Sequence, residues 1–426
     1  MALKKELSLF DLVFYGVGVI LGAGIYVLIG NATAIAGNSV WMSFVLAAVI
    51  ASFTGLSYAE LSSMYPKDAA EYAFVKKAFH DTTTGFVIGW LTFFMTIIGG
   101  AAVALGFGQY FHSLTGVNVA AASTGLVILF GTINYMGIKI SSKINIILTS
   151  LTLFGLLIII FIGLPHIGKI NYFESPGGTF GVLGAAAIVF FAYLGFDETV
   201  NVSEEVKNPK KNVPKAILMS IAITTVIYIL VALSAISVVP WQEIGNSNTP
   251  LALVASTAFG PSAGSLLAIF ALFATASTSF ILMLAASRML FGMAEDHVMP
   301  KPLMRLHKKR KTPYMCILVI TLISIIFIFY GEIKSIALLV DFSAFFVFMM
   351  INLSTMILRF TNPNTKRQFK IPLNIGRLPL LPTLGFLISA YMTLQFQVSL
   401  IWTGIIVMIA GYIFYKFFEA EKTRKK

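Results

Sequence analysis

Residues 16–30 read GVGVILGAGIYVLIG, and this stretch decides how the rest of the chain is interpreted. It lies inside the first long apolar segment, yet it holds five glycines, at positions 16, 18, 22, 24 and 30. Because glycine costs a helix roughly 1 kcal/mol per residue relative to alanine, the cluster Gly22-Ala23-Gly24 predicts a break in the helix. Backbone groups freed by a break at mid-membrane must face protein or a water-filled cavity, where they can bind a small zwitterion or an ion. Close helix packing through Gly18 and Gly22 is the alternative interpretation of the same glycines.

Composition identifies the class of protein. Of 426 residues, 58% are hydrophobic and only 11% are charged, with a mean hydropathy of +0.88. A soluble core cannot absorb this much apolar surface, so the chain is expected to be an all-α integral membrane protein. A polar start with Lys4 and Lys5, followed by no small-residue cleavage site, predicts a retained first span rather than a signal peptide.

The hydrophobic segments of the sequence predict twelve membrane spans, which form one integral membrane domain, residues 1–426. The expected spans are residues 9–30, 40–61, 84–111, 121–138, 144–164, 180–200, 216–239, 264–291, 314–330, 336–360, 379–396 and 399–418. A polar amphipathic piece at residues 65–79 follows the second span and is either an interfacial helix or an inner gate.

The net charge of +12 is distributed as in a membrane protein. With the N-terminus in the cytoplasm and twelve alternating spans, nearly all Lys and Arg residues fall on the cytoplasmic side. The basic clusters 207–215, 301–311 and 366–377 are then loops that face anionic lipid headgroups. We therefore expect a multi-pass protein of the cell membrane with both termini in the cytoplasm, the lipid bilayer as a partner and no nucleic-acid partner.

A second interruption occurs in the sixth span, where residues 185–200 read AAAIVFFAYLGFDETV. Gly195 lies beside Asp197 and Glu198 in an otherwise apolar helix. A charged side chain at the bilayer centre costs about 2.5 to 3.5 kcal/mol, so two carboxylates at this depth need a cavity, a cation or a proton. If the span instead ends here, both carboxylates lie at the inner interface.

The two interruptions suggest an internal repeat. Five spans precede the sixth and five begin with it, and the first span of each set carries a glycine-marked break. Because an odd number of spans reverses the membrane orientation of the second set, the pattern predicts an inverted five-plus-five repeat with a binding site where broken helices 1 and 6 meet. The first repeat covers about residues 9–164 and the second about 180–360, with peripheral helices at about 379–418.

Four stretches resemble permeases of the amino acid–polyamine–organocation (APC) superfamily, most closely its cationic-amino-acid-transporter-like branch. They are GVGVILGAGIY (16–26), YAELSSMYPKDAAEY (58–72), FFAYLGFDETVNVSEEVKNPKKNVPKAI (190–217) and AASRMLFGMAEDHVMP (285–300). The resemblance implies a LeuT-like fold and a secondary active transporter that moves an amino acid substrate across the cytoplasmic membrane by alternating access. An amino acid/polyamine exchanger, or a permease for cationic amino acids or polyamines, is the alternative.

The resemblance also implies a substrate site at the two breaks. It assigns the substrate carboxylate to the backbone N–H groups that follow Gly22, and the ammonium group to backbone carbonyls of both breaks. The residues are Ala23, Gly24 and Ile25 for the carboxylate, and Ile20, Phe191, Ala192 and Leu194 for the ammonium group. Phe191 also matches a gating aromatic, and Gly100 matches a position that contacts substrate. A lining of Gly, Ala, Phe and Leu favours small or apolar neutral amino acids.

Coupling is where the chain departs from part of the superfamily. Proton-coupled relatives carry a lysine in span 5, but that position falls at or near Thr152 here, and residues 144–165 hold no lysine. Three options stay open: symport with a proton through Asp197, Glu198 or Asp341, uncoupled exchange, or symport with sodium. A sodium site would use the carbonyls of Gly18 and Leu21 with hydroxyls of span 8, namely Thr275, Ser277, Thr278 and Ser279.

An intramembrane enzyme and a channel are the rival classes. The five histidines lie at span ends or in loops without paired ligands, so we expect no catalytic residues, no metal site and no cofactor beyond a coupling ion. The sequence contains no repeat that resembles the selectivity filter of a channel. The oligomeric state is not predicted.

Overall fold

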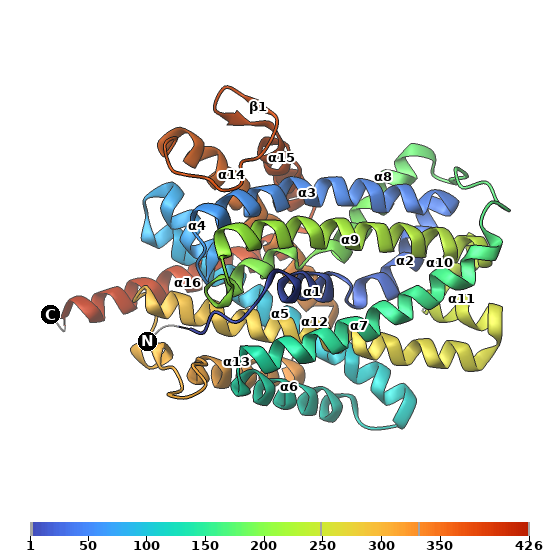
Figure 1. Ribbon diagram of the computed structural model, residues 1–426, viewed down its shortest axis with the longest axis horizontal. Coiled ribbons are helices and arrows are strands. Elements are labelled where there is room, and N and C mark those ends of the chain that lie inside the picture. Colours follow the sequence, from blue (N-terminus) through green and yellow to red (C-terminus); the bar gives the residue numbers. More distant parts are fainter. Residues whose placement is uncertain (1–2, 248, 331–332, 425–426) are drawn as a thin grey trace.

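The computed structural model describes residues 3–247, 249–330 and 333–424, which form an elongated bundle of helices (Figure 1). The first elements, with η for a 3-10 helix, are α1 (Leu9–Ile20), α2 (Ala23–Ala36), η1 (Gly37–Ser39), α3 (Val40–Met64), α4 (Ala70–Phe79), α5 (Thr82–Thr115), α6 (Val119–Met136), α7 (Ile138–Gly163) and η2 (Leu164–His166). The next are α8 (Gly178–Phe190), η3 (Phe191–Tyr193), η4 (Phe196–Glu205), α9 (Pro209–Val238), α10 (Trp241–Asn246), α11 (Pro250–Phe259) and α12 (Pro261–Glu295). The last are η5 (Lys301–Met304), α13 (Tyr314–Tyr330), α14 (Ile333–Thr361), β1 (Asn374–Ile375), β2 (Leu378–Pro379), α15 (Leu380–Leu394) and α16 (Val398–Arg424).

The chain is an all-helical membrane protein, as its composition predicted. Within the described residues, ten helical segments are long and apolar enough to cross a membrane. The helices at the expected ninth and eleventh spans, Tyr314–Phe329 and Leu380–Leu394, are apolar but shorter. Large apolar side chains such as Phe161 and Phe417 are exposed on the outside of the bundle, where they can face lipid.

The helices before and after residue 170 interleave around one core. The helix α3 packs along α9, and α12 packs along α5 (Figure 1). Three of the contacts between the two halves have counterparts with the halves exchanged: α1 packs on α9 as α8 packs on α3, and α7 contacts α9 and α12 as α14 contacts α3 and α5. The two halves are therefore packed in the same pattern, and neither forms a separate core.

The start of the chain is fixed at the end of the bundle where α16 also ends (Figure 1). Ser8 and Asp11 form a capping box on α1, since the backbone N–H of each bonds to the side chain of the other at 2.9 Å and 3.3 Å. The backbone N–H groups of Glu6 and Leu7 donate to the carbonyl of Glu205, at 2.9 and 3.0 Å. The chain before α1 is thus tied to the end of η4.

A two-stranded antiparallel hairpin, β1–β2, links α14 to α15. The sequence indicated only a basic loop there.

Candidate functional site

The first predicted break is present. The helix α1 ends at Ile20 and α2 begins at Ala23, with Gly22 as the N-cap of α2. The first N–H groups of α2, those of Ala23, Gly24 and Ile25, have no carbonyl partner within the helix. A Cβ at Gly22 would collide with the Thr278 hydroxyl of α12, so only glycine lets the break lie against that helix.

The second predicted break is also present. The helix α8 ends at Phe190, one 3-10 turn follows, and η4 begins at Phe196. Gly195 between them has φ of +111°, a conformation that favours glycine, and a Cβ there would lie 2.7 Å from the Val19 side chain of α1. The two breaks meet at Gly24, where an added Cβ would lie 3.0 Å from the Cα of Ala192.

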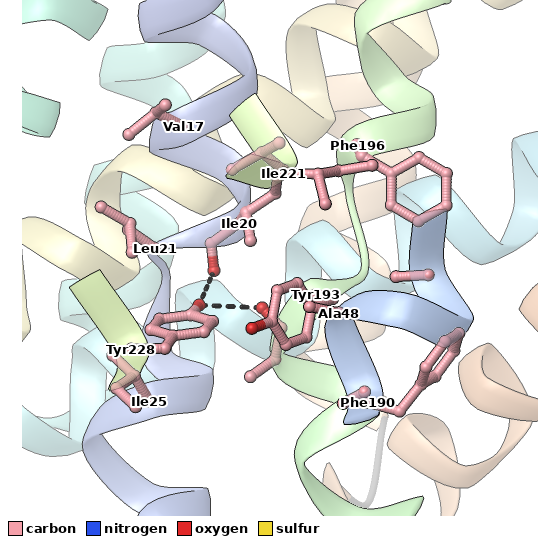
Figure 2. Packing of buried hydrophobic residues seen from close by; sticks show 14 of the residues in the cluster. Val17, Ile20, Leu21, Ile25, Ala48, Phe190, Tyr193, Phe196, Ile221 and Tyr228 are labelled. Carbon is pink, nitrogen blue, oxygen red and sulfur yellow. Dashed lines mark hydrogen bonds between the residues drawn. The ribbon is translucent and has the colours of Figure 1, made fainter. Parts of the chain in front are cut away.

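A tyrosine of α9 joins the two breaks (Figure 2). The Tyr228 hydroxyl lies 2.6 Å from the carbonyl oxygen of Ile20 and 2.8 Å from that of Ala192. The hydroxyl has one proton to donate, whereas each carbonyl has two lone pairs, so both carbonyls keep acceptor capacity for a further donor. Sequence reasoning missed Tyr228 because a tyrosine in an apolar helix carries no signal of its partner.

A cavity of about 180 Å³ lies between the breaks. Pockets for drug-sized ligands run from about 300 Å³ upward, so this cavity suits a smaller molecule. The predicted binding residues that line it are Ile20, Gly22, Gly24, Phe191, Ala192 and Leu194. One wall is apolar and contains Met95, Gly99, Val103, Leu282, Val340 and Ala344, while Thr96 and Thr278 add hydroxyl groups to the lining.

The side chain of Ala23 lies outside the part of the chain that the structure describes, and two other predicted contact residues, Ile25 and Gly100, lie outside this lining. The Ile25 side chain is fully buried in the core. Gly100 faces α12 instead, where its carbonyl accepts a 3.1 Å hydrogen bond from Ser279. Its neighbour Gly99 lines the cavity on α5. The sequence could not distinguish the two glycines because α5 has apolar residues on every face.

The floor of the cavity carries both predicted carboxylates. Asp197 and Glu198 line the cavity and are each 2% exposed. Glu198 accepts hydrogen bonds from the hydroxyl of Thr96, at 2.8 Å, and from the side-chain amide of Asn201, at 3.3 Å. Asp197 accepts from the backbone N–H of Gly195, at 3.1 Å. Both carboxylates are therefore buried beside the cavity rather than exposed on the surface of the protein.

A third carboxylate lies below these two and was not predicted. Glu71 of α4 is fully buried, and among the described residues no donor meets its carboxylate oxygens with ordinary hydrogen-bond geometry. The Tyr58 hydroxyl and the Asn201 side chain are its nearest polar neighbours. Burial, and then the charge of Asp197, raise the pKa of Glu71 to about 8. The available signal was spacing, since Glu71 shares the buried face of α4 with Phe74, Val75 and Ala78.

A buried ion pair closes the bundle below the carboxylates. The guanidinium of Arg288 in α12 donates to Glu205 of η4, with Nε 2.9 Å from Oε2, and neither residue is more than 1% exposed. Beside them the backbone N–H of Glu204 donates to Asp68 at 3.0 Å, and Lys67 pairs with the Glu204 carboxylate at 3.0 Å. These contacts join α12, η4 and the segment before α4 across the end that carries the termini.

The hydroxyls expected at a sodium site are engaged within the protein. Thr278 lies 3.5 Å from the carbonyl of Gly18 and 3.3 Å from that of Val19. The Thr152 hydroxyl donates to the carbonyl of Leu148 in its own helix, at 3.0 Å. Leu21 is buried and its N–H bonds to the carbonyl of Val17 at 2.8 Å.

Thr149, one turn before Thr152, faces Gly18 from α7. A Cβ at Gly18 would collide with the Thr149 hydroxyl, which also lies 3.3 Å from Ser277. Asp341 is partly buried in α14, next to the cavity residue Val340, and is not itself in the lining. Among the described residues, no group of His, Cys, Asp and Glu has a metal-binding arrangement.

Comparison with known proteins gives one consistent result. The sequence profile of a family described as "Amino acid permease" matches residues 7–415. The branched-chain amino acid permease BcaP of Bacillus subtilis is 28% identical, and the alignment covers 99% of this chain and 95% of that protein. The methylthioribose transporter of the same organism is 29% identical, over 96% and 92% respectively. The vacuolar cationic amino acid transporter 4 of Arabidopsis thaliana is 28% identical, over 85% of this chain and 64% of that protein.

Proposed function

Because this chain belongs to the amino acid permease family of the APC superfamily, it is a membrane transporter and not an enzyme, and we propose that it carries small or apolar neutral amino acids. The observation that carries the proposal is the position of the cavity. Unpaired N–H groups at the start of α2 lie on one side, carbonyl groups of both breaks lie beside them, and an apolar wall lies opposite.

Each part of an amino acid has a matching surface. The carboxylate binds the N–H groups at the start of α2, where the helix dipole adds a partial positive charge. The ammonium group binds the carbonyls of Ile20 and Ala192, which keep free acceptor capacity beside Tyr228. The side chain then lies against residues such as Gly99, Leu282 and Ala344.

The transport cycle is alternating access in a LeuT-like fold of twelve spans with an inverted five-plus-five repeat. The exchanged packing of the two halves, with breaks in the first helix of each, supports this proposal. Phe191 acts as a gate over the substrate: its ring lines the cavity and lies edge-on to Phe345, with centroids 6.0 Å apart.

The coupling ion is a proton. Asp197 and Glu198 at the cavity floor, with Glu71 below them, form a buried acidic cluster that cannot hold three negative charges at once. A sodium site near Gly18 is the alternative, because hydroxyls that donate to carbonyls there keep lone pairs for a cation. Asp341 remains a secondary proton candidate.

A cationic cargo is the second candidate function. The carboxylates of Asp197 and Glu198 line the cavity, and an ammonium or guanidinium side chain could pair with them. Such a cargo would need to replace a proton on the cluster, so its transport would run as exchange.

The protein resides in the cell membrane with both termini in the cytoplasm. Support comes from the distribution of Lys and Arg residues and from the common end at which α1 is tied down and α16 ends (Figure 1).

The decisive experiment is uptake of labelled alanine and leucine into proteoliposomes, with an inward proton gradient, an inward sodium gradient or no gradient. Accumulation with the proton gradient alone supports the proposal. Accumulation with sodium alone contradicts the proton cluster as the coupling site. If arginine or putrescine competes more strongly than alanine or leucine, the substrate is a cationic amino acid or a polyamine.

A further inference from the structure

A second cavity, of about 340 Å³, lies where α14 ends and the β1–β2 hairpin begins. It shares no lining residue with the substrate cavity and has the opposite chemistry. Four of its seven lining residues are cationic: Arg359, Arg367, Lys370 and Arg377. Of the described residues, the carboxylate that pairs with this group is Glu60 of α3, which leaves three positive charges uncompensated.

Two of these residues build the wall of the cavity. Glu60 is 1% exposed and accepts from Arg359, from Arg367 and from the backbone N–H of Ile371. Arg367 is fully engaged, because its two terminal nitrogens also donate to four backbone carbonyls between Leu358 and Thr365, at 3.0 to 3.2 Å. Arg367 therefore holds the loop and has no hydrogen left for a ligand.

The other three cations have free donors. Arg359 is 6% exposed, and its Nε atom is buried without a hydrogen-bond partner, although it lines the cavity. Lys370 and Arg377 are exposed and make no ion pair with the described residues. Arg359 lines the cavity together with Lys370 and Arg377, and among the described residues Glu60 is the carboxylate that pairs with this basic group, so an anion that enters the cavity would supply the missing negative charge.

The surroundings place the cavity at a membrane surface. It opens on the connection between α14 and α15, two apolar helices of the bundle. The hairpin beside it exposes Leu373 and Ile375, at 62% and 67%, next to Arg377. Apolar side chains beside basic ones suit the boundary between acyl chains and headgroups.

We propose that this cavity is a binding site for a phosphate group, supplied by the headgroup of an anionic lipid or by a soluble phosphate. Arg359 contributes its charge from the buried wall, and Lys370 and Arg377 donate from the rim. The ligand fastens the end of α14 to the hairpin. Val340 and Ala344 of the same helix line the substrate cavity. A phosphate bound at the end of α14 therefore also affects the helix that forms part of the transport site.

The test measures lipid binding to the purified full-length protein by native mass spectrometry, with phosphatidylglycerol compared with phosphatidylcholine. The double variant Lys370→Gln/Arg377→Gln removes the two exposed cations and leaves the Glu60 contacts intact. The matched control, Lys210→Gln/Lys211→Gln, removes two exposed cations from the start of α9, outside the cavity. We expect wild type and control to prefer phosphatidylglycerol, and the double variant to bind it at least about tenfold more weakly.

A second arm separates the two sources of phosphate. Thermal melting in phosphatidylcholine nanodiscs is measured with and without inorganic phosphate. A soluble phosphate is supported as the ligand if two results are obtained together. Inorganic phosphate must stabilise wild type but not the double variant, and wild type must show no preference for phosphatidylglycerol over phosphatidylcholine. The proposal is overturned if neither ligand distinguishes wild type from the double variant, or if the control variant loses binding equally.

Discussion

The hydroxyl of Tyr228 in α9 lies 2.6 Å from the carbonyl oxygen of Ile20, the last residue of α1 before the first break (Figure 2). The same hydroxyl is 2.8 Å from the carbonyl of Ala192. One side chain thus fixes the spacing of the two unwound segments, and with it the spacing of the groups that bind substrate.

Replacement Tyr228→Phe should therefore weaken binding without unfolding the protein. The two carbonyls lose a shared donor, and a neutral hydrogen bond contributes about 1 kcal/mol, so we expect about a fivefold loss of affinity. Substrate binding to the purified variant measures this. Tyr172→Phe is the control, since Tyr172 lies in the loop before α8 and its hydroxyl bonds to the Ser237 hydroxyl, 2.7 Å away, and to neither break. Equal effects of the two variants would contradict the role of Tyr228.

Substitution at Gly24 tests the carboxylate site. Because an added Cβ would lie 3.0 Å from the Cα of Ala192, Gly24→Ala should lower affinity and Gly24→Leu should abolish binding. Size-exclusion chromatography shows whether the variant stays folded. Gly125→Ala serves as control, because an added Cβ there meets nothing within 4 Å. Retained transport by Gly24→Leu would exclude the N–H groups of α2 as the carboxylate site.

How far the sequence predicted this site depends on the kind of signal each residue carries. Both breaks were predictable because glycines such as Gly22 and Gly195 stand out in apolar segments, whatever they contact. The residues of the cavity wall were not predictable. Whether Gly99 or Gly100 lines the cavity depends on how α5 is rotated about its axis, and a helix that is apolar on all sides has no hydrophobic periodicity that shows which face points inward. Partners far apart in sequence, such as Glu60 and Arg359, were equally hidden.

Glu71 predicts a pH dependence of stability. Its pKa rises from an ordinary 4.5 to about 8 in the folded protein, so the folded state keeps a proton that the unfolded chain releases. Stability then falls as the pH rises from about 4.5 to about 8, by at most about 1.4 kcal/mol per pH unit. Glu71→Gln should flatten this profile and be more stable than wild type above about pH 8.

Thermal melting of the purified protein across this pH range measures the effect. Glu243→Gln, at an exposed carboxylate of α10, should keep the wild-type profile. A Glu71→Gln profile as steep as that of wild type would show that another group binds the proton.

The ion pair of Arg288 and Glu205 predicts that removal of one partner lowers stability far more than removal of both. Arg288→Ala leaves the Glu205 carboxylate buried without its partner, which costs about 3–5 kcal/mol and lowers the melting temperature. The double variant Arg288→Met/Glu205→Leu removes both charges and should recover most of the loss. Breaking the exposed pair of Lys416 and Glu419 by Lys416→Gln should change nothing measurable. A double variant as unstable as Arg288→Ala would mean that packing, rather than the unpaired charge, sets the effect.

The wall residue Gly99 predicts which amino acids the cavity accepts. A Cβ built there makes only ordinary contacts, 3.7 Å from the side chains of Leu282 and Val340, so Gly99→Val can be accommodated by the helices. Its two methyl groups instead occupy part of a cavity of only about 180 Å³. Uptake of leucine should fall about fivefold or more relative to uptake of alanine, because a clash of overpacked groups costs about 1–3 kcal/mol. Gly100→Ala, which faces α12, should change the two rates together if it changes them at all. Equal loss of alanine and leucine uptake in Gly99→Val would mean that the substrate side chain does not lie against α5.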